Sequence, residues 1–182
     1  IDEDSSTIFL PEPGMKIDLG GIAKGYIVDQ GLKIAENSSA SALFVNAGGD
    51  ISVAGNKPSG ENWRIAIQDP FDSQKLIAVL KVKEGSIATS GGYQRFFEVD
   101  GKRYHHILDP ATGYPASEVA SVSILAPDTI TADALSTAVF VLGLDDGMEL
   151  LESLDGVEGV IIDGQGKIFA SSGLMDDLEI VE

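Results

Sequence analysis

Short stretches of the chain alternate between hydrophobic and polar positions, which is typical of strands that bury only one face. The segments 63–68 and 119–125 alternate most regularly. Asp100 and Gly101 lie between two further hydrophobic stretches, and this dipeptide is a strong signal for a two-residue hairpin turn. The pattern therefore predicts strands at residues 42–45, 51–54, 63–68, 76–82, 85–90, 95–99, 103–107, 119–125, 157–162 and 167–170.

Helical spacing of hydrophobic residues occurs in a few longer segments. Residues 22–37 have this spacing directly after a pair of glycines. Residues 128–143 have it as well and end at Gly143, a residue type favoured just after a helix. A shorter helix is expected at residues 145–154. Because strands outnumber helices and short turns join most of them, the pattern predicts an α+β fold with a largely antiparallel sheet and a few packed helices.

The chain is expected to form one domain over residues 1–182, since domains commonly contain about 50–250 residues. The acidic segment 1–13 ends in two prolines and is expected to be a lead-in or a short edge element. A strand, an acid near a turn and an apolar helix are expected around Asp18 and again around Asp133. This echo suggests a duplicated half-domain.

The composition narrows the possible partners. The chain has 29 acidic and 12 basic residues, which give a formal net charge of −17. Such a charge disfavours binding to nucleic acids or to anionic membranes, and a phosphorylated ligand would need a divalent cation to offset the repulsion. The absence of cysteine excludes disulfides and thiolate chemistry. No segment approaches the roughly 18 apolar residues of a transmembrane helix, and the chain begins at Ile1, so we expect a processed or truncated product.

The first candidate cluster is the segment 17–30, IDLGGIAKGYIVDQ. Paired glycines before a helix allow backbone N–H groups to approach a ligand, and the helix N-terminus adds positive potential. Lys24 would place a further positive charge at the same end of the helix. The segment predicts a cradle for a phosphorylated ligand, and the alternative is a tight turn with a solvent-facing lysine.

The second candidate cluster is the segment 104–115, YHHILDPATGYP. His105 and His106 are adjacent, so on a strand they point to opposite faces, and at most one is expected to face a given site. His106 could act as a base or form a hydrogen bond with a bound ring, because the pKa of histidine lies near neutrality. The alternative is a surface hairpin that is followed by an Asp-Pro turn.

The third candidate cluster is ADALSTA, in which Asp133 and Thr137 are four residues apart and lie on one helix face. A carboxylate and a hydroxyl are oxygen ligands of the kind that Mg²⁺ prefers. The alternative is that Asp133 is a first-turn acid favoured by the helix dipole and Thr137 is a packing residue.

Read in order, the chain contains IDLGGIAKGY, NAGGDI, WRIAIQDP, IATSGGYQR, YHHILDPATGYP and ADALSTAVFVLG. These motifs, which span residues 17–143, together closely resemble the ApbE family, the FAD:protein FMN transferases. The resemblance implies an ApbE-like fold and an enzyme that cleaves FAD, attaches FMN through its phosphate to a threonine of an acceptor protein and releases AMP. Family members usually have a further N-terminal region, so the resemblance also implies that this chain is the C-terminal portion of such a protein.

The resemblance implies a role for a residue only where its motif matches. It implies that Mg²⁺ is bound by Asp133, by Thr137 and by the backbone carbonyl of Gly21. Of the two histidines, it selects His106 as the residue beside the reacting centre. It implies contacts with the flavin nucleotide for the following residues: Asp18, Lys24, Ser90, Gly91, His106 and Ile107.

The resemblance also implies partners and a location. FAD would be the substrate, Mg²⁺ the cofactor, and the acceptor a flavoprotein subunit of the respiratory type with a target threonine. The location would be extracytoplasmic, either periplasmic or lipid-anchored. Two alternatives stay open: an FAD pyrophosphatase that produces FMN and AMP, and an FAD-binding module without turnover. The transferase and the pyrophosphatase are favoured over the binding module by the presence of Asp133, Thr137, Lys24 and His106.

Overall fold

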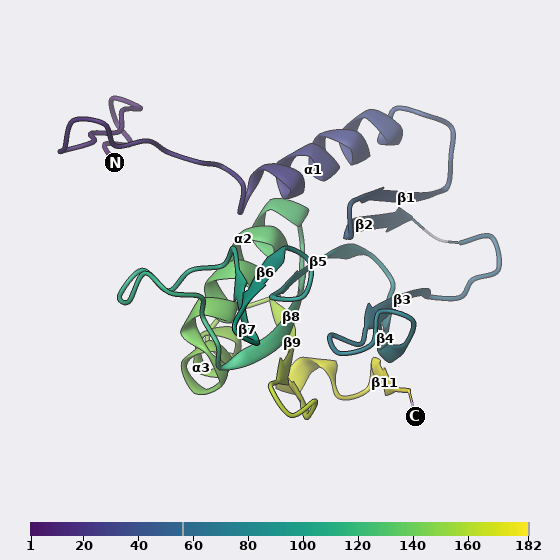
Figure 1. The fold of residues 1–182 in the computed structure, drawn as a ribbon. Helices are drawn as coiled ribbons and strands as arrows, with labels where there is room; N and C mark the ends of the chain where they lie inside the picture. The colour runs from purple at the N-terminus through teal and green to yellow at the C-terminus, as the bar shows by residue number, and fades with distance from the viewer. Residues whose placement is uncertain (56, 182) are drawn as a thin grey trace.

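The computed structural model describes residues 1–55 and 57–181 as an α+β fold (Figure 1). The helices are α1 (Ala23–Glu36), α2 (Thr129–Leu142) and α3 (Leu144–Glu152), and η1 (Ser172–Leu174) is a short 3₁₀ helix. The strands are β1 (Ala42–Ala47), β2 (Asp50–Gly55), β3 (Trp63–Gln68), β4 (Leu76–Val82), β5 (Gly85–Gly91), β6 (Phe96–Val99), β7 (Lys102–His105), β8 (Val119–Ala126), β9 (Glu158–Asp163), β10 (Ile168–Ala170) and β11 (Leu178–Ile180).

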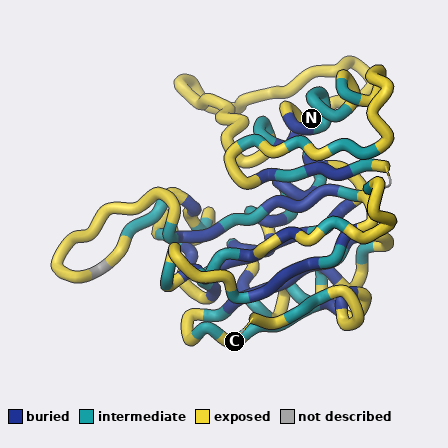
Figure 2. Tube along the Cα trace, turned by 90° about the vertical axis from the view of Figure 1, so that its right-hand side faces the viewer, coloured by how far each residue is buried: buried dark blue, intermediate teal, exposed yellow. Residues whose placement is uncertain are grey.

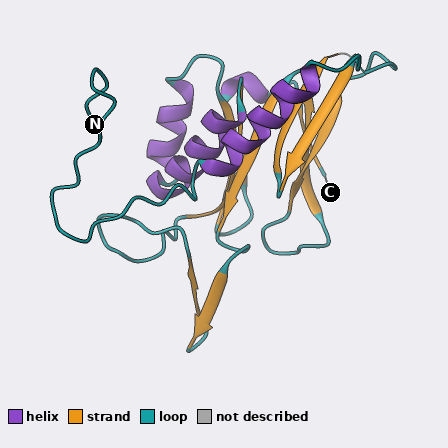
Figure 3. Cartoon of the chain, turned by 90° about the horizontal axis from the view of Figure 1, so that it is seen from above, coloured by secondary structure: helices purple, strands orange, loops and turns teal. Residues whose placement is uncertain are grey.

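The centre of the fold is a six-stranded sheet with the order β1-β2-β5-β8-β9-β10. Every neighbouring pair in this sheet is antiparallel. The helices lie together on one face of the sheet (Figure 3), and a smaller sheet with the order β11-β4-β3 packs on the other side. The predicted α+β class and the largely antiparallel sheet are therefore confirmed.

The alternation of side chains along β9 explains why both faces of the sheet are covered. Ile161 is fully buried in the cluster beneath the helices, whereas Val160 and Ile162 are buried in the cluster beneath the smaller sheet. Successive side chains of a strand point to opposite faces, so an unbroken apolar strand requires a packing partner on each side. Figure 2 shows this buried centre within an exposed periphery.

The predicted hairpin at Asp100 and Gly101 is confirmed. Both residues have positive φ, 51° and 75°, as a two-residue turn of this type requires. The hairpin of β6 and β7 projects from the rest of the chain (Figures 2 and 3). β7 ends at His105, earlier than the expected strand 103–107, because the chain turns there into a loop closed by an isolated bridge between Leu108 and Pro115.

Other differences from the predicted elements lie near the two ends of the chain. β11 was not predicted, and it exists because its residues pair with β4 far away in the sequence. Residues 8–18 form no strand and are exposed, so the suggested repeat around Asp18 lacks the strand that β8 provides before α2. Among the described residues, no helix is long and apolar enough to cross a membrane.

Gly25 allows α1 to cross α2 at close range. A Cβ atom added to Gly25 would lie 2.7 Å from the Cα of Ile130 and still closer to the carbonyl oxygen of Thr129. Both are backbone atoms in the first turn of α2, so no change of side-chain rotamer could make room. Glycine weakens a helix relative to alanine, and the close crossing explains why the helix nevertheless has one here.

We predict that Gly25→Ala lowers the free energy of unfolding by about 2–3 kcal/mol, because overpacking strain outweighs the gain in helix propensity. Urea unfolding followed by circular dichroism measures the change. Gly31→Ala is the matched control in the same helix, since its added Cβ would meet only the Cγ1 of Val45, at 3.2 Å. Equal destabilisation by the two substitutions would contradict the role given to the crossing.

Candidate functional site

The crossing of α1 and α2 brings the first and third candidate clusters together. The backbone N–H of Gly25 donates a hydrogen bond of 2.9 Å to Oδ2 of Asp133, which is only 4% exposed. The carboxylate of Asp29 in α1 accepts hydrogen bonds from the N–H groups of Thr129 and Ile130, at 2.8 and 3.0 Å. α1 thus satisfies two N–H groups that the first turn of α2 leaves free, and this fixes the two helices in register.

Thr137 lies one helical turn after Asp133 and faces the glycine turn before α1. A Cβ atom added to Gly21 would lie 3.8 Å from Oγ1 of Thr137. Asp18, Gly21 and Thr137 line the same groove, which has a volume of about 560 Å³. Oδ1 of Asp18 accepts a hydrogen bond of 2.7 Å from the N–H of Gly20, and this bond holds the turn in its shape.

β5 contacts α2 through hydroxyl groups beside Thr137. Oγ of Ser90 lies 2.8 Å from Oγ of Ser136 and 3.1 Å from Oγ1 of Thr137. Ser136 in turn donates a hydrogen bond of 2.9 Å to the carbonyl oxygen of Asp133. The next residue of β5, Gly91, has no room for a side chain, because the ring of Tyr93 fills the space where its Cβ would be.

Lys24 forms an ion pair that the sequence did not predict. Its Nζ lies 2.9 Å from Oδ1 of Asp50, a residue that is only 1% exposed. Burial raises the pKa of Asp50 above its ordinary value; the hydrogen bond and charge of Lys24 oppose this rise, and the charge of Asp133 adds to it. Among the described residues, Oδ2 of Asp50 has no hydrogen-bond partner. In the sequence, the signal that could have indicated Asp50 as a site residue was its position directly after the glycine pair Gly48 and Gly49.

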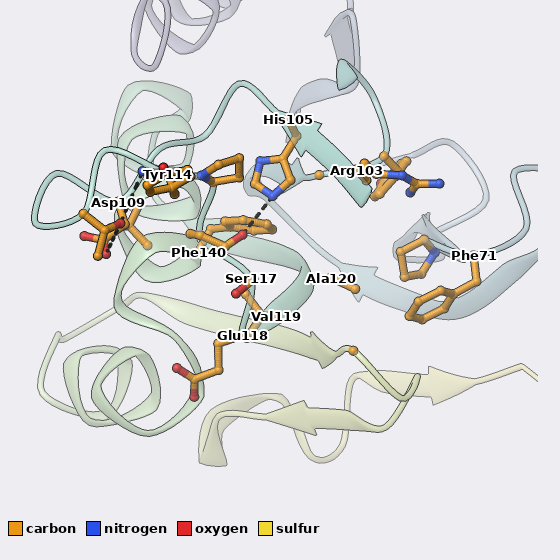
Figure 4. A pocket seen from close by; sticks show the side chains of 18 residues that line it. Phe71, Arg103, His105, Asp109, Tyr114, Ser117, Glu118, Val119, Ala120 and Phe140 are labelled. Carbon is orange, nitrogen blue, oxygen red and sulfur yellow. Dashed lines mark hydrogen bonds between the residues drawn. The ribbon is translucent and has the colours of Figure 1, made fainter. Parts of the chain in front are cut away.

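The two adjacent histidines differ in their environments. Nε2 of His105 must donate its bond of 2.8 Å to Ala116, because a carbonyl oxygen only accepts, and Nδ1 accepts from the N–H of Ile107 at 3.3 Å. Figure 4 shows a dashed line for the Nε2 bond at the ring of His105. Burial lowers the pKa of His105, and the hydrogen bond to Ala116 opposes this effect. His105 is therefore a neutral residue with both ring nitrogens engaged.

His106 is exposed and holds its ring in the opposite tautomer. Its Nδ1 lies 3.3 Å from the carbonyl oxygen of Arg95, so Nδ1 carries the proton of this bond. In the neutral ring, Nε2 then has a free lone pair that can accept a proton. Ile107, by contrast, is 6% exposed, and its side chain packs in the main core. The flavin contacts expected for these two residues stay predictions.

A second cavity, of about 640 Å³, lies on the other side of the Asp109–Pro115 turn. Pro110 in this turn lines the first groove, whereas Asp109 and Tyr114 line the second cavity, and Val141 lines both. Figure 4 shows aromatic side chains around the second cavity, among them Tyr114 and Phe140. Aromatic walls with a few charged groups suit a planar ring or an apolar side chain.

The donor atoms at the groove fit a hard cation. The hydroxyl of Thr137 and the main chain of Gly21 line the groove, and the carboxylate of Asp133 lies one helical turn before Thr137, where the N–H of Gly25 binds it. The described residues contain no cluster of three acidic or histidine side chains that would enclose a metal on its own. Such a partial oxygen set suits Mg²⁺, which usually keeps ligand phosphates and water in its coordination shell. Asp50, whose Oδ2 has no hydrogen-bond partner in the described part of the chain, adds negative potential that acts on Asp133.

The fold is α+β, and the candidate site combines oxygen donors where two helices cross beside an antiparallel sheet. The chain belongs to the ApbE family, because the model of the ApbE family matches residues 1–161. This confirms the family that the motifs indicated.

Named relatives and solved structures agree with this assignment. The FAD:protein FMN transferase of Treponema pallidum is 40% identical over 97% of this chain and 51% of its own length. That of Klebsiella pneumoniae is 37% identical over 94% of this chain and 53% of its own length. The crystal structure of the ApbE protein from Thermotoga maritima has a TM-score of 0.81 and 46% identity over 88% of this chain and 53% of that one.

The flavin transferase ApbE from Vibrio cholerae has a TM-score of 0.77 and 35% identity, over 91% of this chain and 53% of that one. The chain thus spans about half the length of the relatives that it matches.

We predict that His105 makes the protein less stable as the pH falls. In the unfolded chain His105 takes up a proton near pH 6.5, whereas in the folded chain its lowered pKa delays this to a lower pH. The unfolded state therefore binds more protons in this window, and stability is lost as the pH drops through 6.5. An NMR titration of the ring protons should give a midpoint below 6.5 for His105.

The variant His106→Gln leaves a single histidine and so assigns the signal in this titration. His105→Gln should flatten the decline of the unfolding free energy below about pH 6.5, because it removes a group that titrates there. A titration midpoint at or above 6.5 would contradict the prediction.

Proposed function

We propose that this chain forms the site of a magnesium-dependent flavin transferase, which cleaves FAD, attaches FMN through a phosphoester to a threonine of an acceptor protein and releases AMP. The relatives named FAD:protein FMN transferase support the transfer of FMN from FAD. The observation that carries the proposal is that Gly21 and Thr137 line one groove, and that Asp133, one turn before Thr137 on α2, accepts the N–H of Gly25 in α1. Lys24 lies in the first turn of α1. Because the chain spans about half of these relatives, the activity of the whole protein belongs to the proposal.

The proposed cation would be held by the carbonyl oxygen of Gly21, the carboxylate of Asp133 and the hydroxyl of Thr137. When bound, Mg²⁺ supplies positive charge to the pyrophosphate oxygens. Oδ2 of Asp133 already accepts a hydrogen bond from the N–H of Gly25, so the orientation of this ligand is fixed before any ion binds.

Lys24 would bind a phosphate oxygen of FAD. Its ammonium group has three N–H donors, and one of them is directed to Asp50. The Lys24 side chain is 42% exposed, so the remaining donors are accessible to a ligand. Asp50 fixes the position of the ammonium group. The positive charge of Lys24 beside a pyrophosphate oxygen would stabilise the negative charge that develops as the bond breaks.

His106 would take the proton of the attacking threonine hydroxyl on Nε2. The hydrogen bond from Nδ1 to Arg95 supports this role, because it leaves Nε2 as the basic nitrogen. The threonine oxygen forms a bond to the phosphorus of the FMN half, the bond from that phosphorus to the AMP oxygen breaks, and AMP leaves with the bonding electron pair. Such transfer depends mainly on positioning and electrostatics.

The remaining assignments of the proposal rest on the family resemblance. Contacts with the flavin nucleotide would come from Asp18, Ser90, Gly91 and Ile107. Of these, Asp18 lines the groove, and Ser90 contacts Thr137, which also lines it. The acceptor would be a respiratory flavoprotein subunit, and the location would be extracytoplasmic.

We predict that Asp133→Asn lowers AMP release from FAD in the presence of Mg²⁺ by about 100-fold or more, because it removes a charged ligand of the cation. The asparagine oxygen can still accept the hydrogen bond from Gly25, so the fold is expected to stay intact. The assay incubates the chain with FAD, Mg²⁺ and a threonine-bearing acceptor, and follows AMP by chromatography and covalent flavin by in-gel fluorescence.

Asp145→Asn is the matched control, because Asp145 is an exposed acid in the first turn of α3. Unchanged AMP release by Asp133→Asn would refute the metal assignment. FMN and AMP without a labelled acceptor would identify a pyrophosphatase, and bound FAD without AMP release would identify a binding module.

We predict that His106→Gln slows flavin transfer by roughly 10²–10⁴-fold, the usual contribution of a general base. The affinity for Mg²⁺ should stay unchanged, because His106 is not among the proposed ligands. Equal rates of transfer in the variant and the unsubstituted chain would remove His106 from the mechanism.

A further inference from the structure

A chain of three hydroxyl groups connects β5 with the face of α2 that borders the groove. Thr137 Oγ1 lies 3.1 Å from Ser90 Oγ, Ser90 Oγ lies 2.8 Å from Ser136 Oγ, and Ser136 Oγ lies 2.9 Å from the carbonyl oxygen of Asp133. Ser136 is 1% exposed, so water does not compete for these bonds at the inner end of the chain.

The bond from Ser136 to the carbonyl oxygen of Asp133 determines the direction of every proton in this series of hydroxyl groups. The carbonyl oxygen of Asp133 only accepts, so the single proton of Ser136 is directed to it. Ser136 must then accept from Ser90, and this uses the single proton of Ser90. Ser90 is left as an acceptor, and the hydroxyl of Thr137 donates to it.

The outer end of the chain is the proposed cation ligand. With its proton directed to Ser90, Thr137 turns its oxygen lone pairs away from β5. The free side of Thr137 borders the groove that Gly21 and Asp18 also line. A hydroxyl coordinates a cation through a lone pair, and a proton that faced the cation would oppose binding.

We propose that Ser136 and Ser90 are positioning residues, which orient the hydroxyl of Thr137 so that its lone pairs face the cation. This inference rests on the proposed function, because it concerns the cation of that site. Neither serine touches the cation in this arrangement. Both act through the proton of Thr137, as outer-shell partners commonly orient the ligands of a metal.

The proposal differs from a packing role in what the loss of Ser136 does. Without its hydroxyl, the proton of Ser90 has no acceptor at the inner end and can turn to Oγ1 of Thr137. The proton of Thr137 is then displaced toward the groove. A packing role would lower the stability of the metal-free chain and would leave the affinity for a cation unchanged.

The first test measures the binding of Mg²⁺ to the metal-free chain by calorimetry, with Mn²⁺ as a second probe by electron paramagnetic resonance. Ser136→Ala is expected to weaken binding by roughly three- to tenfold, which corresponds to the loss of one hydrogen bond in the arrangement. Ser123→Ala is the matched control, because Ser123 is also 1% exposed and its hydroxyl lies 2.8 Å from that of Thr89. Thr89 directly precedes Ser90 in β5. It should change the affinity by less than about twofold.

The second test is a double-mutant cycle. Ser90→Ala should also weaken binding, and Ser136→Ala added to it should have no further effect, because the two serines act through one proton of Thr137. Independent effects of the two substitutions on affinity would overturn the proposal, as would an unchanged affinity in Ser136→Ala. Thermal unfolding of the metal-free variants reports folding separately from binding.

The failure of this inference is distinguishable from the failure of the proposed function. Binding that Asp133→Asn abolishes and that Ser136→Ala leaves unchanged would overturn the hydroxyl arrangement alone. An unsubstituted chain that binds neither Mg²⁺ nor Mn²⁺ would overturn the cation site and the hydroxyl arrangement together.

Discussion

The close crossing of α1 over α2 at Gly25 is the constraint on which the rest of the site depends. Because Gly25 has no side chain, its N–H group reaches the buried carboxylate of Asp133 at 2.9 Å. Lys24 lies one residue before Gly25 and Gly21 lies four residues before it, so one crossing positions both relative to the face of α2 that carries the proposed metal ligands. Asp29, one turn further along α1, holds the first turn of α2 and prevents the helices from sliding. A site assembled in this way tolerates little change in the helix spacing.

The electrostatic character of the groove follows from the same packing. Asp50 and Asp133 are both nearly buried, and only one oxygen of Asp50 is matched by Lys24. Desolvation of a carboxylate is costly unless charge or hydrogen bonds compensate it. A pyrophosphate would bring further negative charge to this place in a chain of net charge −17. A phosphate ligand would therefore need a cation to offset this charge, which supports the proposed metal-dependent reaction.

Much of the fold could be predicted from the sequence because its signals are local. The bounds of β3 follow from alternation, and the hairpin and the end of α2 follow from Asp100, Gly101 and Gly143. β11 has only three residues, too few for a periodic signal, and depends on pairing with β4. The residues of the candidate site were chosen from motifs, but motifs do not show contacts. The ion pair of Lys24 with Asp50 and the burial of Ile107 depend on packing between segments that are distant in the sequence.

Backbone carbonyl groups provide a further layer of specification that no sequence pattern records. A carbonyl oxygen only accepts hydrogen bonds, so a histidine or hydroxyl side chain that bonds to it must act as the donor. Ala116 fixes the tautomer of His105, and Arg95 fixes the opposite tautomer of its neighbour His106. The carbonyl of Asp133 sets the direction of the hydroxyl chain that ends at Thr137. The protonation pattern of the site is therefore determined by where the main chain passes, and identical side chains on a shifted backbone would have a different chemistry.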